Sequence, residues 1–263
     1  LGDVTSSPWD DVIPILGSPS ALERSTGNET VWQGRETFPQ AVLCCCCCCG
    51  CGWGGGAFVG RMAKYGDAEY WQDRYLRDPE PFDWYQKYSG LREHLVQHIK
   101  PNHRILMVGC GNSRLSEEMY DDGFRNIHNV DISSVVIQAM QEKNARRDEM
   151  TWEVMDCTHM EPLKSSSFDV VIDKGTLDAI LCGSSSTASA EQMCSECARV
   201  LKDEGVFILI SYGQPESRIG YLDKPEYGWT VKHYNIPKPT IGAVLPEEKD
   251  FPNYHYIYVC TKK

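Results

Sequence analysis

The sequence has no excess of basic residues. Its 26 Lys and Arg are outnumbered by 37 Asp and Glu, which gives a formal net charge of −11. Proteins that bind nucleic acid usually carry a basic face, so this balance argues against a nucleic-acid substrate. It fits a small molecule or a basic protein surface better.

Long apolar runs are missing as well. No stretch is suited to a transmembrane helix, which needs about 20 predominantly apolar residues. The nearest stretch, 41–60, consists largely of glycine and other small residues. The amino-terminal part also lacks a basic segment ahead of an apolar one, which a secretory signal peptide requires. We therefore expect no membrane partner.

The cysteines do not form a disulfide framework. Of the 13, seven lie within 44–51, and the other six are scattered through apparent core segments. This pattern is typical of an intracellular, reduced protein, and we expect a cytoplasmic location. Cys194 and Cys197 form a C-x-x-C without a second pair or a nearby histidine. We interpret them as packing residues and expect no metal site.

Residues 1–61 differ in composition from the rest of the chain. They contain no lysine, are rich in Gly, Ser, Thr and Pro, and include an uninterrupted cysteine run at 44–49. Neither a helical nor a strand period is visible. We expect a disordered extension or a translated leader, with a metal-binding or lipidated tail as the functional alternative. Deletion of this segment should leave activity intact, and we place the folded domain at 62–263.

A short apolar run followed by a glycine turn stands at the centre of this domain. Residues 105–108 read Ile-Leu-Met-Val, and Gly109, Cys110 and Gly111 follow. A buried strand, a glycine turn and a helix start make a nucleotide-binding corner, and glycine lets the backbone approach a ligand closely. Position 114 holds Arg where dinucleotide-binding proteins have a third glycine. S-adenosylmethionine, which has adenosine but no phosphate, needs less room; a tight turn without a ligand is the alternative.

Acidic residues end the next two expected strands. Asp131 lies 20 positions after Gly111, at the end of the strand at 126–132. A carboxylate there can accept hydrogen bonds from ribose hydroxyls, and capping of the next helix is the alternative. Asp156 follows the strand at 151–155, where an acid can accept from the adenine amino group. The two carboxylates therefore predict an adenosine site.

Strands and helices alternate through most of the domain. We expect strands at 105–108, 126–132, 151–155, 168–172 and 206–211, and helices at 67–76, 113–121, 134–145 and 188–202, plus one across 91–99. This predicts an α/β fold with a mostly parallel sheet and helices on both faces. Two last strands, 229–234 and 254–260, are joined by a proline-rich loop, which predicts an antiparallel hairpin at the edge. A seven-stranded sheet ending in this way favours a Rossmann-like class I methyltransferase over a nicotinamide dehydrogenase.

Three motifs and two aromatic segments point to one protein family. They are Val108-Gly-Cys-Gly-Asn-Ser113, Val130-Asp-Ile-Ser-Ser134, Asp173-Lys-Gly-Thr-Leu-Asp-Ala179, Tyr70-Trp71 and Phe82-Asp-Trp84. Over about 64–263 the chain resembles the methyltransferase-like lysine methyltransferases of translation elongation factor 1-alpha. The third motif is quite specific to this group, although a mitochondrial citrate-synthase lysine methyltransferase shares part of it. The glycine motif is generic.

The resemblance implies an S-adenosylmethionine-dependent protein-lysine N-methyltransferase with elongation factor 1-alpha as its substrate. Gly109 would lie under the methionine moiety, and Asp131 and Ile132 would hold ribose and adenine. Asp156 and Cys157 would meet the adenine edge. The implied cofactor-binding residues are Trp71, Tyr75, Trp84, Gly109, Gly111, Asp131, Ile132, Asp156, Cys157 and Lys174, the last of which completes the pocket.

The aromatic residues Trp71, Tyr75 and Trp84 have two interpretations. Trp71 and Tyr75 are four residues apart and share a helix face, which by itself indicates packing of that helix against the sheet. By the resemblance, the aromatic residues would instead cover the cofactor, where their faces favour a sulfonium cation.

The expected reaction is in-line methyl transfer to a neutral lysine amine. Because free lysine has a pKa of about 10.4, desolvation and the neighbouring sulfonium must lower it. Asp173 and Asp178 are candidates to position the lysine, and anchoring of the turn after 168–172 is the alternative for each. A carboxylate beside the amine would favour its charged form, so we assign no strong general base.

One position in the strand at 105–108 departs from the pattern common among methyltransferases. Many methyltransferases have Asp or Glu where this chain has Met107, so the cofactor's amino group must find an acceptor elsewhere, in the region of Asp173.

Two other functions stay open. One is a small-molecule methyltransferase on the same fold, and the other is a cofactor-binding module without catalysis.

Overall fold

The computed structural model describes residues 64–239 and 253–263. The expectations for 1–61 lie outside these residues. Within the two described ranges, no helix combines the length and the apolar character needed to cross a bilayer.

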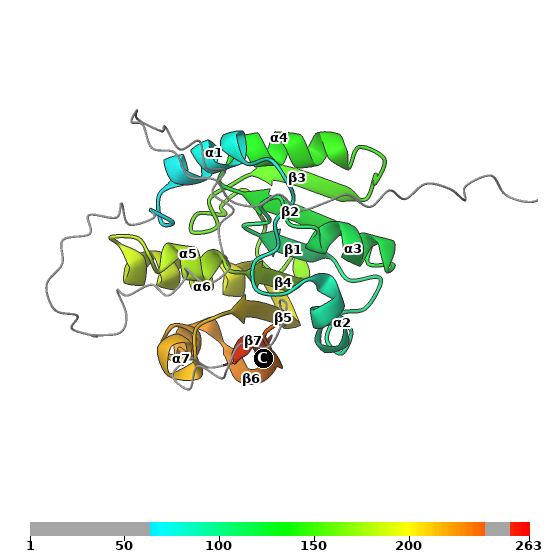
Figure 1. The fold of residues 1–263 in the computed structure, drawn as a ribbon. Coiled ribbons are helices and arrows are strands. Elements are labelled where there is room, and N and C mark those ends of the chain that lie inside the picture. Colours follow the sequence, from blue (N-terminus) through cyan, green and yellow to red (C-terminus); the bar gives the residue numbers. More distant parts are fainter. Residues whose placement is uncertain (1–63, 240–252) are drawn as a thin grey trace, which may run out of the picture. The chain divides into compact units, whose positions relative to one another are not determined.

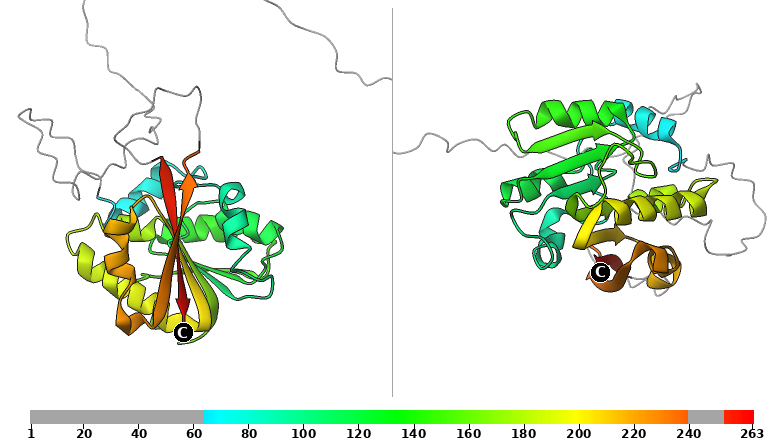
Figure 2. Two further views of the ribbon diagram at one scale, coloured as in Figure 1. Left: turned by 90° about the horizontal axis from the view of Figure 1, so that it is seen from below. Right: turned by 180° about the vertical axis from the view of Figure 1, so that it is seen from behind.

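A seven-stranded sheet forms the centre of the domain, in the order β3-β2-β1-β4-β5-β7-β6 (Figure 1). The strands are β1 (Ile105–Val108), β2 (Ile127–Asp131), β3 (Met150–Val154), β4 (Phe168–Lys174), β5 (Leu201–Ser211), β6 (Trp229–Pro237) and β7 (Tyr254–Lys262). The first five strands are parallel, and β7 runs antiparallel to both β5 and β6 (Figure 2). The expected fold class and its antiparallel edge hairpin are confirmed.

Two helices precede β1, and the other helices lie in the connections between strands. They are α1 (Ala68–Arg77), α2 (Tyr88–Leu95), α3 (Leu115–Asp121), α4 (Ser134–Lys143), α5 (Thr176–Ile180), α6 (Ser186–Val200) and α7 (Pro215–Leu222), with a 3-10 turn, η1 (Pro225–Tyr227). α1, α3, α4 and α6 lie within two residues of the expected bounds, and α2 ends earlier than expected. The short helices α5 and α7 were not predicted, because they offer few turns for an apolar period.

Alternate residues of β1 face the two helical layers. Leu106 and Val108 pack in an apolar cluster with residues of α5, α6 and α7, whereas Ile105 and Met107 pack with residues of α2, α3 and α4. All four side chains are at most 3% exposed. A strand buried on both faces reads as a continuous apolar run, which explains why β1 was visible in the sequence.

The transition from α6 to β5 differs from the prediction. α6 ends at 200 and β5 begins at 201, so the helix ends two residues before the expected 202 and the strand begins five residues before the expected 206. The register of the β4–β5 pairing shifts here, and Glu204 adopts a positive φ of 63°. A Cβ on Gly205 would lie 2.8 Å from the Lys202 carbonyl oxygen. The glycine is therefore required by close packing in this irregular part of β5.

The carboxyl ends of β1, β2 and β4 meet at one edge of the sheet. Val108, the last residue of β1, pairs with Val130 of β2 and with Asp173 of β4. In open parallel α/β sheets, ligands bind in the crevice outside these strand ends. The loops that follow the three strands therefore form the candidate site.

Candidate active site

The glycine loop after β1 has two residues in left-handed conformations. Gly109 has a φ of 59° and Gly111 a φ of 52°. A Cβ on Gly109 would overlap the side chain of Thr176, whose hydroxyl donates to the Val108 carbonyl at 3.1 Å. A Cβ on Gly111 would lie 2.7 Å from the Tyr75 hydroxyl. Both glycines are needed for backbone conformation and for space.

Arg114 replaces the third glycine without strain. Its backbone φ is −82°, and it stands at the start of α3. Its side chain is 57% exposed and lies 3.6 Å from Glu118. Position 114 therefore requires no glycine.

Asp131 ties the glycine loop to the loop after β2. Its Oδ2 accepts the Gly111 backbone N–H at 2.9 Å, and its Oδ1 accepts the Ser133 N–H at 2.9 Å. Burial raises the pKa of this carboxyl to about 6. A carboxylate can accept about four hydrogen bonds, so capacity for a further one remains, and the apolar side chain of Ile132 beside it is 38% exposed. A carboxylate beside an open apolar side chain suits a ribose and its base.

Asp156 and Cys157 lie at the end of β3, next to β2. The Met155 N–H donates to the Asp131 carbonyl at 2.9 Å, which joins the two strand ends. Oδ1 of Asp156 accepts from the N–H and hydroxyl of Thr158 at 2.8 and 2.7 Å. Cys157 is buried, which raises its thiol pKa. The structure thus brings the four residues expected around the adenosine to adjacent strand ends.

Lys174 fastens the aromatic segment at 82–85 to the end of β4. Its Nζ lies 3.0 Å from Oδ1 of Asp83 and 3.2 Å from the Trp84 carbonyl oxygen. The same Asp83 oxygen accepts the Ser113 hydroxyl at 2.5 Å. Burial lowers the pKa of Lys174. Asp83 was missed as a site residue, although it lies within the quoted Phe-Asp-Trp segment.

The aromatic residues Trp71, Tyr75 and Trp84 contact one another in a chain of rings. The rings of Trp71 and Tyr75 stack with centroids 5.9 Å apart, and the Trp71 and Trp84 rings lie 6.5 Å apart. Tyr75 packs on Val136 and Met140 of α4. Helix α1 therefore rests on α4, and Figure 1 shows the two helices side by side.

Gln72 is a contact that sequence reasoning missed. Its Oε1 accepts the Ser133 hydroxyl at 2.6 Å and the Val135 N–H at 3.2 Å. Its Nε2 donates to the Ser134 hydroxyl at 3.0 Å. These bonds hold α1 against the start of α4. A glutamine in a charged helix gives no sequence signal for such a role.

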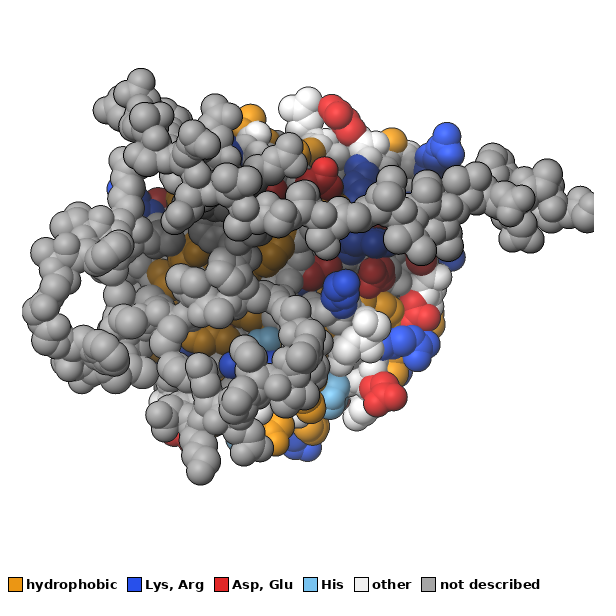
Figure 3. All heavy atoms as spheres, in the orientation of Figure 1, with side chains coloured by type: hydrophobic (Ala, Val, Ile, Leu, Met, Phe, Trp, Pro, Cys, Tyr) orange, Lys and Arg blue, Asp and Glu red, His pale blue; other side chains and the backbone are white. Residues whose placement is uncertain are grey.

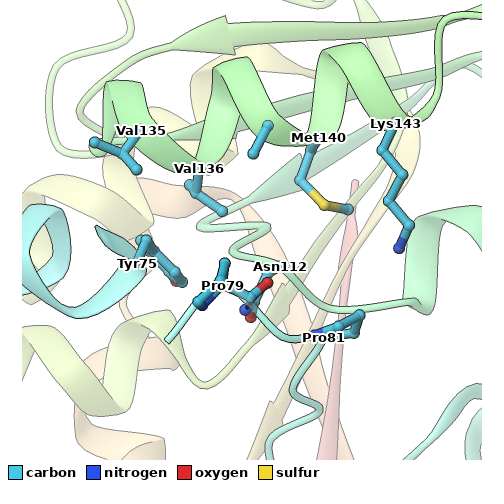
Figure 4. Close-up of a pocket in the computed structure, with 9 residues that line it drawn as sticks. Tyr75, Pro79, Pro81, Asn112, Val135, Val136, Met140 and Lys143 are labelled. Atoms are coloured by element: carbon cyan, nitrogen blue, oxygen red, sulfur yellow. Dashed lines mark hydrogen bonds between the residues drawn. The ribbon is translucent and has the colours of Figure 1, made fainter. Parts of the chain in front are cut away.

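A cavity of about 150 Å³ adjoins the glycine loop between α4 and the turn at 79–81 (Figure 4). It is lined by Tyr75, Pro79, Pro81, Asn112, Val135, Val136, Ala139, Met140 and Lys143. Asn112 donates to the Glu80 carbonyl at 2.5 Å, and Lys143 pairs with Glu117 at 2.6 Å. Because these polar groups already have partners, the cavity offers mainly apolar surface.

Asp173 anchors the turn after β4. It is fully buried, and its oxygens accept the backbone N–H groups of Thr176 at 2.7 Å and Leu177 at 2.9 Å. Burial raises its pKa to about 7. This geometry matches the anchoring alternative for Asp173, and its carboxylate faces α5. An acceptor for the cofactor's amino group in this region stays a prediction.

Asp178 stands at the centre of a buried polar network. Its oxygens accept from Arg218 Nη2 at 2.8 Å, from the Ser211 hydroxyl at 2.6 Å and from the Tyr85 hydroxyl at 2.8 Å. The Tyr212 N–H also donates to it at 3.2 Å. Asp178 has a side-chain exposure of 2%. Its carboxylate is enclosed by its own hydrogen-bond donors, so it can act on a bound substrate only through them.

The described residues contain no cluster of three His, Cys, Asp or Glu side chains that could hold a metal ion. Cys194 and Cys197 are fully buried in the apolar cluster on the α6 side of the sheet. Their interpretation as packing residues is confirmed. On the part of the described surface visible in Figure 3, positive and negative side chains are mixed.

Comparison with known proteins identifies the family. Residues 106–209 match the protein-family profile described as "Methyltransferase domain". The chain is 37% identical over 179 residues to EEF1A lysine methyltransferase 4 of Bos taurus, covering 64% of this chain and 70% of that protein. The chain belongs to the eEF1A lysine methyltransferase family.

A longer relative in this family covers more of the chain. The eEF1A lysine and N-terminal methyltransferase of Homo sapiens is 37% identical over 206 residues, which is 76% of this chain and 29% of that protein. The chain thus spans less than a third of that relative's length. The resemblance stated from the motifs is confirmed.

Solved structures agree on the fold of this family member. A chain from the complex of the Haloferax volcanii Trm112 activator with a methyltransferase has a TM-score of 0.50 at 16% identity, covering 74% of this chain and 93% of that chain. The [4+2]-cyclase SpnF has a TM-score of 0.51 at 13% identity, covering 69% and 84%. The expected cofactor, S-adenosylmethionine, is confirmed, and the glycine cradle and the Asp131–Ile132 pair fit it.

Proposed function

We propose that the chain is an S-adenosylmethionine-dependent protein-lysine N-methyltransferase that acts on translation elongation factor 1-alpha. The supporting observation is a glycine corner closed by Asp131, Tyr75 and Thr176 in a chain 37% identical to EEF1A lysine methyltransferase 4. A cytoplasmic site of action and a protein partner follow from this substrate.

In this proposal, the residues at each strand end contact a different part of the cofactor. Gly109 lies under the methionine part, and the two glycines let Thr176 and Tyr75 pack against the loop, because a Cβ at either position would meet these side chains. Asp131 accepts from the ribose hydroxyls with its remaining lone pairs, and Ile132 covers the adenine. Asp156 and Cys157 border the adenine edge, next to Asp131 across the strand ends.

The aromatic segments close the opposite side of the cofactor. Trp71 and Tyr75 come from α1, and Trp84 comes from the segment that Lys174 fastens to β4. Aromatic faces favour a cation such as a sulfonium. Lys174 acts as a clamp for this segment, since its charge is paired with Asp83 at 3.0 Å.

When bound by the glycine corner, Asp131 and the aromatic segments, the cofactor would supply an electrophilic methyl group on its sulfonium. The methyl would pass to the neutral lysine nitrogen, the electron pair of the broken C–S bond would stay on sulfur, and the product ammonium would release a proton to water. The protein residues contribute alignment and desolvation, which bring the amine and methyl together in line.

The test is transfer of labelled methyl from S-adenosylmethionine to purified elongation factor 1-alpha. The wild-type chain should label one or more lysines of this protein, mapped by mass spectrometry. Ile132→Asp should abolish cofactor binding and labelling, because it puts a charge against the adenine. Val96→Asp is the matched control, since Val96 and Ile132 are both 38% exposed.

Three outcomes separate the proposed function from its alternatives. Labelled lysine in elongation factor 1-alpha supports the proposal. Turnover with small amines but not with this protein would favour a small-molecule methyltransferase. Cofactor binding by calorimetry without turnover on a whole lysate would favour a non-catalytic module.

A further inference from the structure

Tyr85 has an unusual backbone conformation next to the candidate site. Its φ is 62°, a left-handed value that a bulky residue rarely adopts. The side chain is only 9% exposed. Strained residues of this kind persist where surrounding contacts over-determine them, and they cluster at functional sites.

Several contacts hold the Tyr85 ring in place. Its hydroxyl donates to Oδ2 of Asp178 at 2.8 Å. A Cβ on Gly175 would lie 3.2 Å from the ring, so the absence of a side chain at 175 makes room for it. The ring also lies 6.0 Å from the Tyr212 ring and 5.1 Å from the His255 ring, between centroids.

The location of Tyr85 follows from the neighbours of Gly175. Gly175 contacts the Tyr85 ring, and the next residue, Thr176, lies against Gly109 in the glycine loop. The preceding residue, Lys174, binds the carbonyl of Trp84, which precedes Tyr85. The phenol therefore lies beside the cofactor corner, at the carboxyl end of β4.

The Asp178 carboxylate, to which the phenol donates, uses its hydrogen-bonding capacity within the protein, and its charge is paired with that of Arg218. Asp178 accepts two hydrogen bonds from Arg218, at 2.8 and 3.0 Å, in addition to those from Ser211, Tyr85 and Tyr212. The Asp178 and Arg218 side chains are 2% and 4% exposed. No lone pair of Asp178 is directed to a substrate, so the carboxylate fixes the direction of the Tyr85 proton.

Apart from the Asp178–Arg218 pair, the neighbours of the phenol include three aromatic side chains. Trp84 and Tyr212 are half-buried, with ring centroids 6.2 and 6.0 Å from that of Tyr85. His255 Nδ1 lies 3.3 Å from Gln86 Nε2, and because an amide NH₂ only donates, Nδ1 accepts. Burial lowers the His255 pKa to about 4, so the ring is neutral near pH 7.

We propose that the Tyr85 phenolic oxygen orients the acceptor amine, with Asp178 and Arg218 fixing its hydroxyl proton so that the oxygen presents only lone pairs to the substrate. Trp84 and Tyr212 flank the alkyl stem of the substrate side chain. This inference rests on the proposed function for the identity of the acceptor as an alkyl amine. It assigns Asp178 a positioning role and makes Tyr85 the residue that touches the substrate.

A neutral phenol solves a problem that a carboxylate would create. A carboxylate beside the amine would stabilise the ammonium form, which cannot attack. A phenol oxygen accepts one N–H without adding charge, and burial together with Asp178 raises the pKa of Tyr85 so that it stays neutral. The remaining nitrogen lone pair is then free to face the methyl group.

Binding of a two-part ligand tests this inference without turnover. The probe is an S-adenosylhomocysteine analogue whose sulfur is replaced by a nitrogen carrying a three-carbon chain that ends in a primary amine. The comparison ligand carries a chain of equal length ending in a methyl group. Calorimetry should give at least about fivefold tighter binding of the amine ligand to the wild-type chain, from one added hydrogen bond to a charged group.

Tyr85→Phe should remove this preference and leave affinity for the methyl-ended ligand unchanged within about twofold. Tyr88→Phe is the matched control. Tyr88 is also buried, and its hydroxyl donates to an aspartate, Asp122, that is paired with Arg92. This control should keep the preference for the amine.

Asp178→Asn supplies a second variant that keeps the phenol. Its amide can donate to the Tyr85 oxygen, which turns the hydroxyl proton outward and should also abolish the preference. No preference in the wild-type chain, or a preference that survives Tyr85→Phe, would overturn the inference. If the preference holds while elongation factor 1-alpha is not labelled, the proposed function fails and Tyr85 orients the amine of another substrate.

Discussion

The Nζ of Lys174 and the Oδ1 of Asp83 lie 3.0 Å apart, with side-chain exposures of 5% and 11%. The pair joins residues 91 positions apart in the sequence. It connects the end of β4 to the aromatic segment at 82–85, and through Ser113 it also reaches the glycine loop. One buried ion pair thus fixes three parts of the site.

Loss of one partner of this pair should be costly. Asp83→Asn leaves the Lys174 charge buried without compensation, and we expect a loss of about 3–5 kcal/mol in the free energy of unfolding. Lys174→Met should cost a similar amount, whereas the double variant should recover much of it. Urea unfolding of the four proteins measures this coupling. Additive single effects would show that the two side chains do not interact energetically.

Gly109→Ala should remove cofactor binding. The new Cβ would meet Thr176 as well as straining a φ of 59°, so we expect at least a tenfold weaker affinity for S-adenosylmethionine. Gly123→Ala is the control, because its φ is 105° but a Cβ there would meet nothing within 4 Å. It should cost about 1–2 kcal/mol of stability and keep normal affinity. Equal losses of affinity in both variants would contradict the steric account.

Asp131 should make stability depend on pH. Its folded-state pKa is raised to about 6, compared with about 3.9 when unfolded. The folded state therefore holds the proton more tightly, and the stabilisation present below pH 4 is lost as pH rises through 6.

Comparison with Asp131→Asn isolates this contribution from other titrating groups. The wild-type free energy of unfolding, minus that of the variant, should fall by up to about 3 kcal/mol between pH 4 and pH 7. Denaturant titrations at several pH values measure it. A difference that stays flat or rises over this range would contradict the raised pKa.

Gln72→Ala should weaken cofactor binding with little effect on global stability. The substitution removes the hydrogen bonds to Ser133, Ser134 and Val135 that hold α1 against α4. Amide hydrogen exchange in α1 should become faster, and the Kd for S-adenosylmethionine should rise about three- to tenfold. Gln97→Ala, which removes an exposed bond to the Glu93 carbonyl, should leave both measurements unchanged.

The sequence alone determined the strand that carries the glycine loop and the antiparallel end of the sheet. The run at 105–108 is buried on both faces, so it was recognisable without its partners. Gly109 and Gly111 come just after β1 and Asp131 ends β2, and parallel strands bring such residues to one edge. Periodicity and short spacing are local properties, and for that reason they could be read from the chain.

The tertiary structure decided which groups meet and what the acidic residues do. Tyr85 and Asp178 are 93 positions apart, and no spacing rule connects them. Asp173 and Asp178 looked equivalent in their motif. Asp173, however, accepts a hydrogen bond from the backbone of α5, whereas Asp178 forms an ion pair with Arg218. The irregular stretch at 202–205 likewise proved to be part of β5, although the strand was expected only from 206. Hydrogen-bond partners and burial depend on packing between distant segments, which local sequence pattern does not encode.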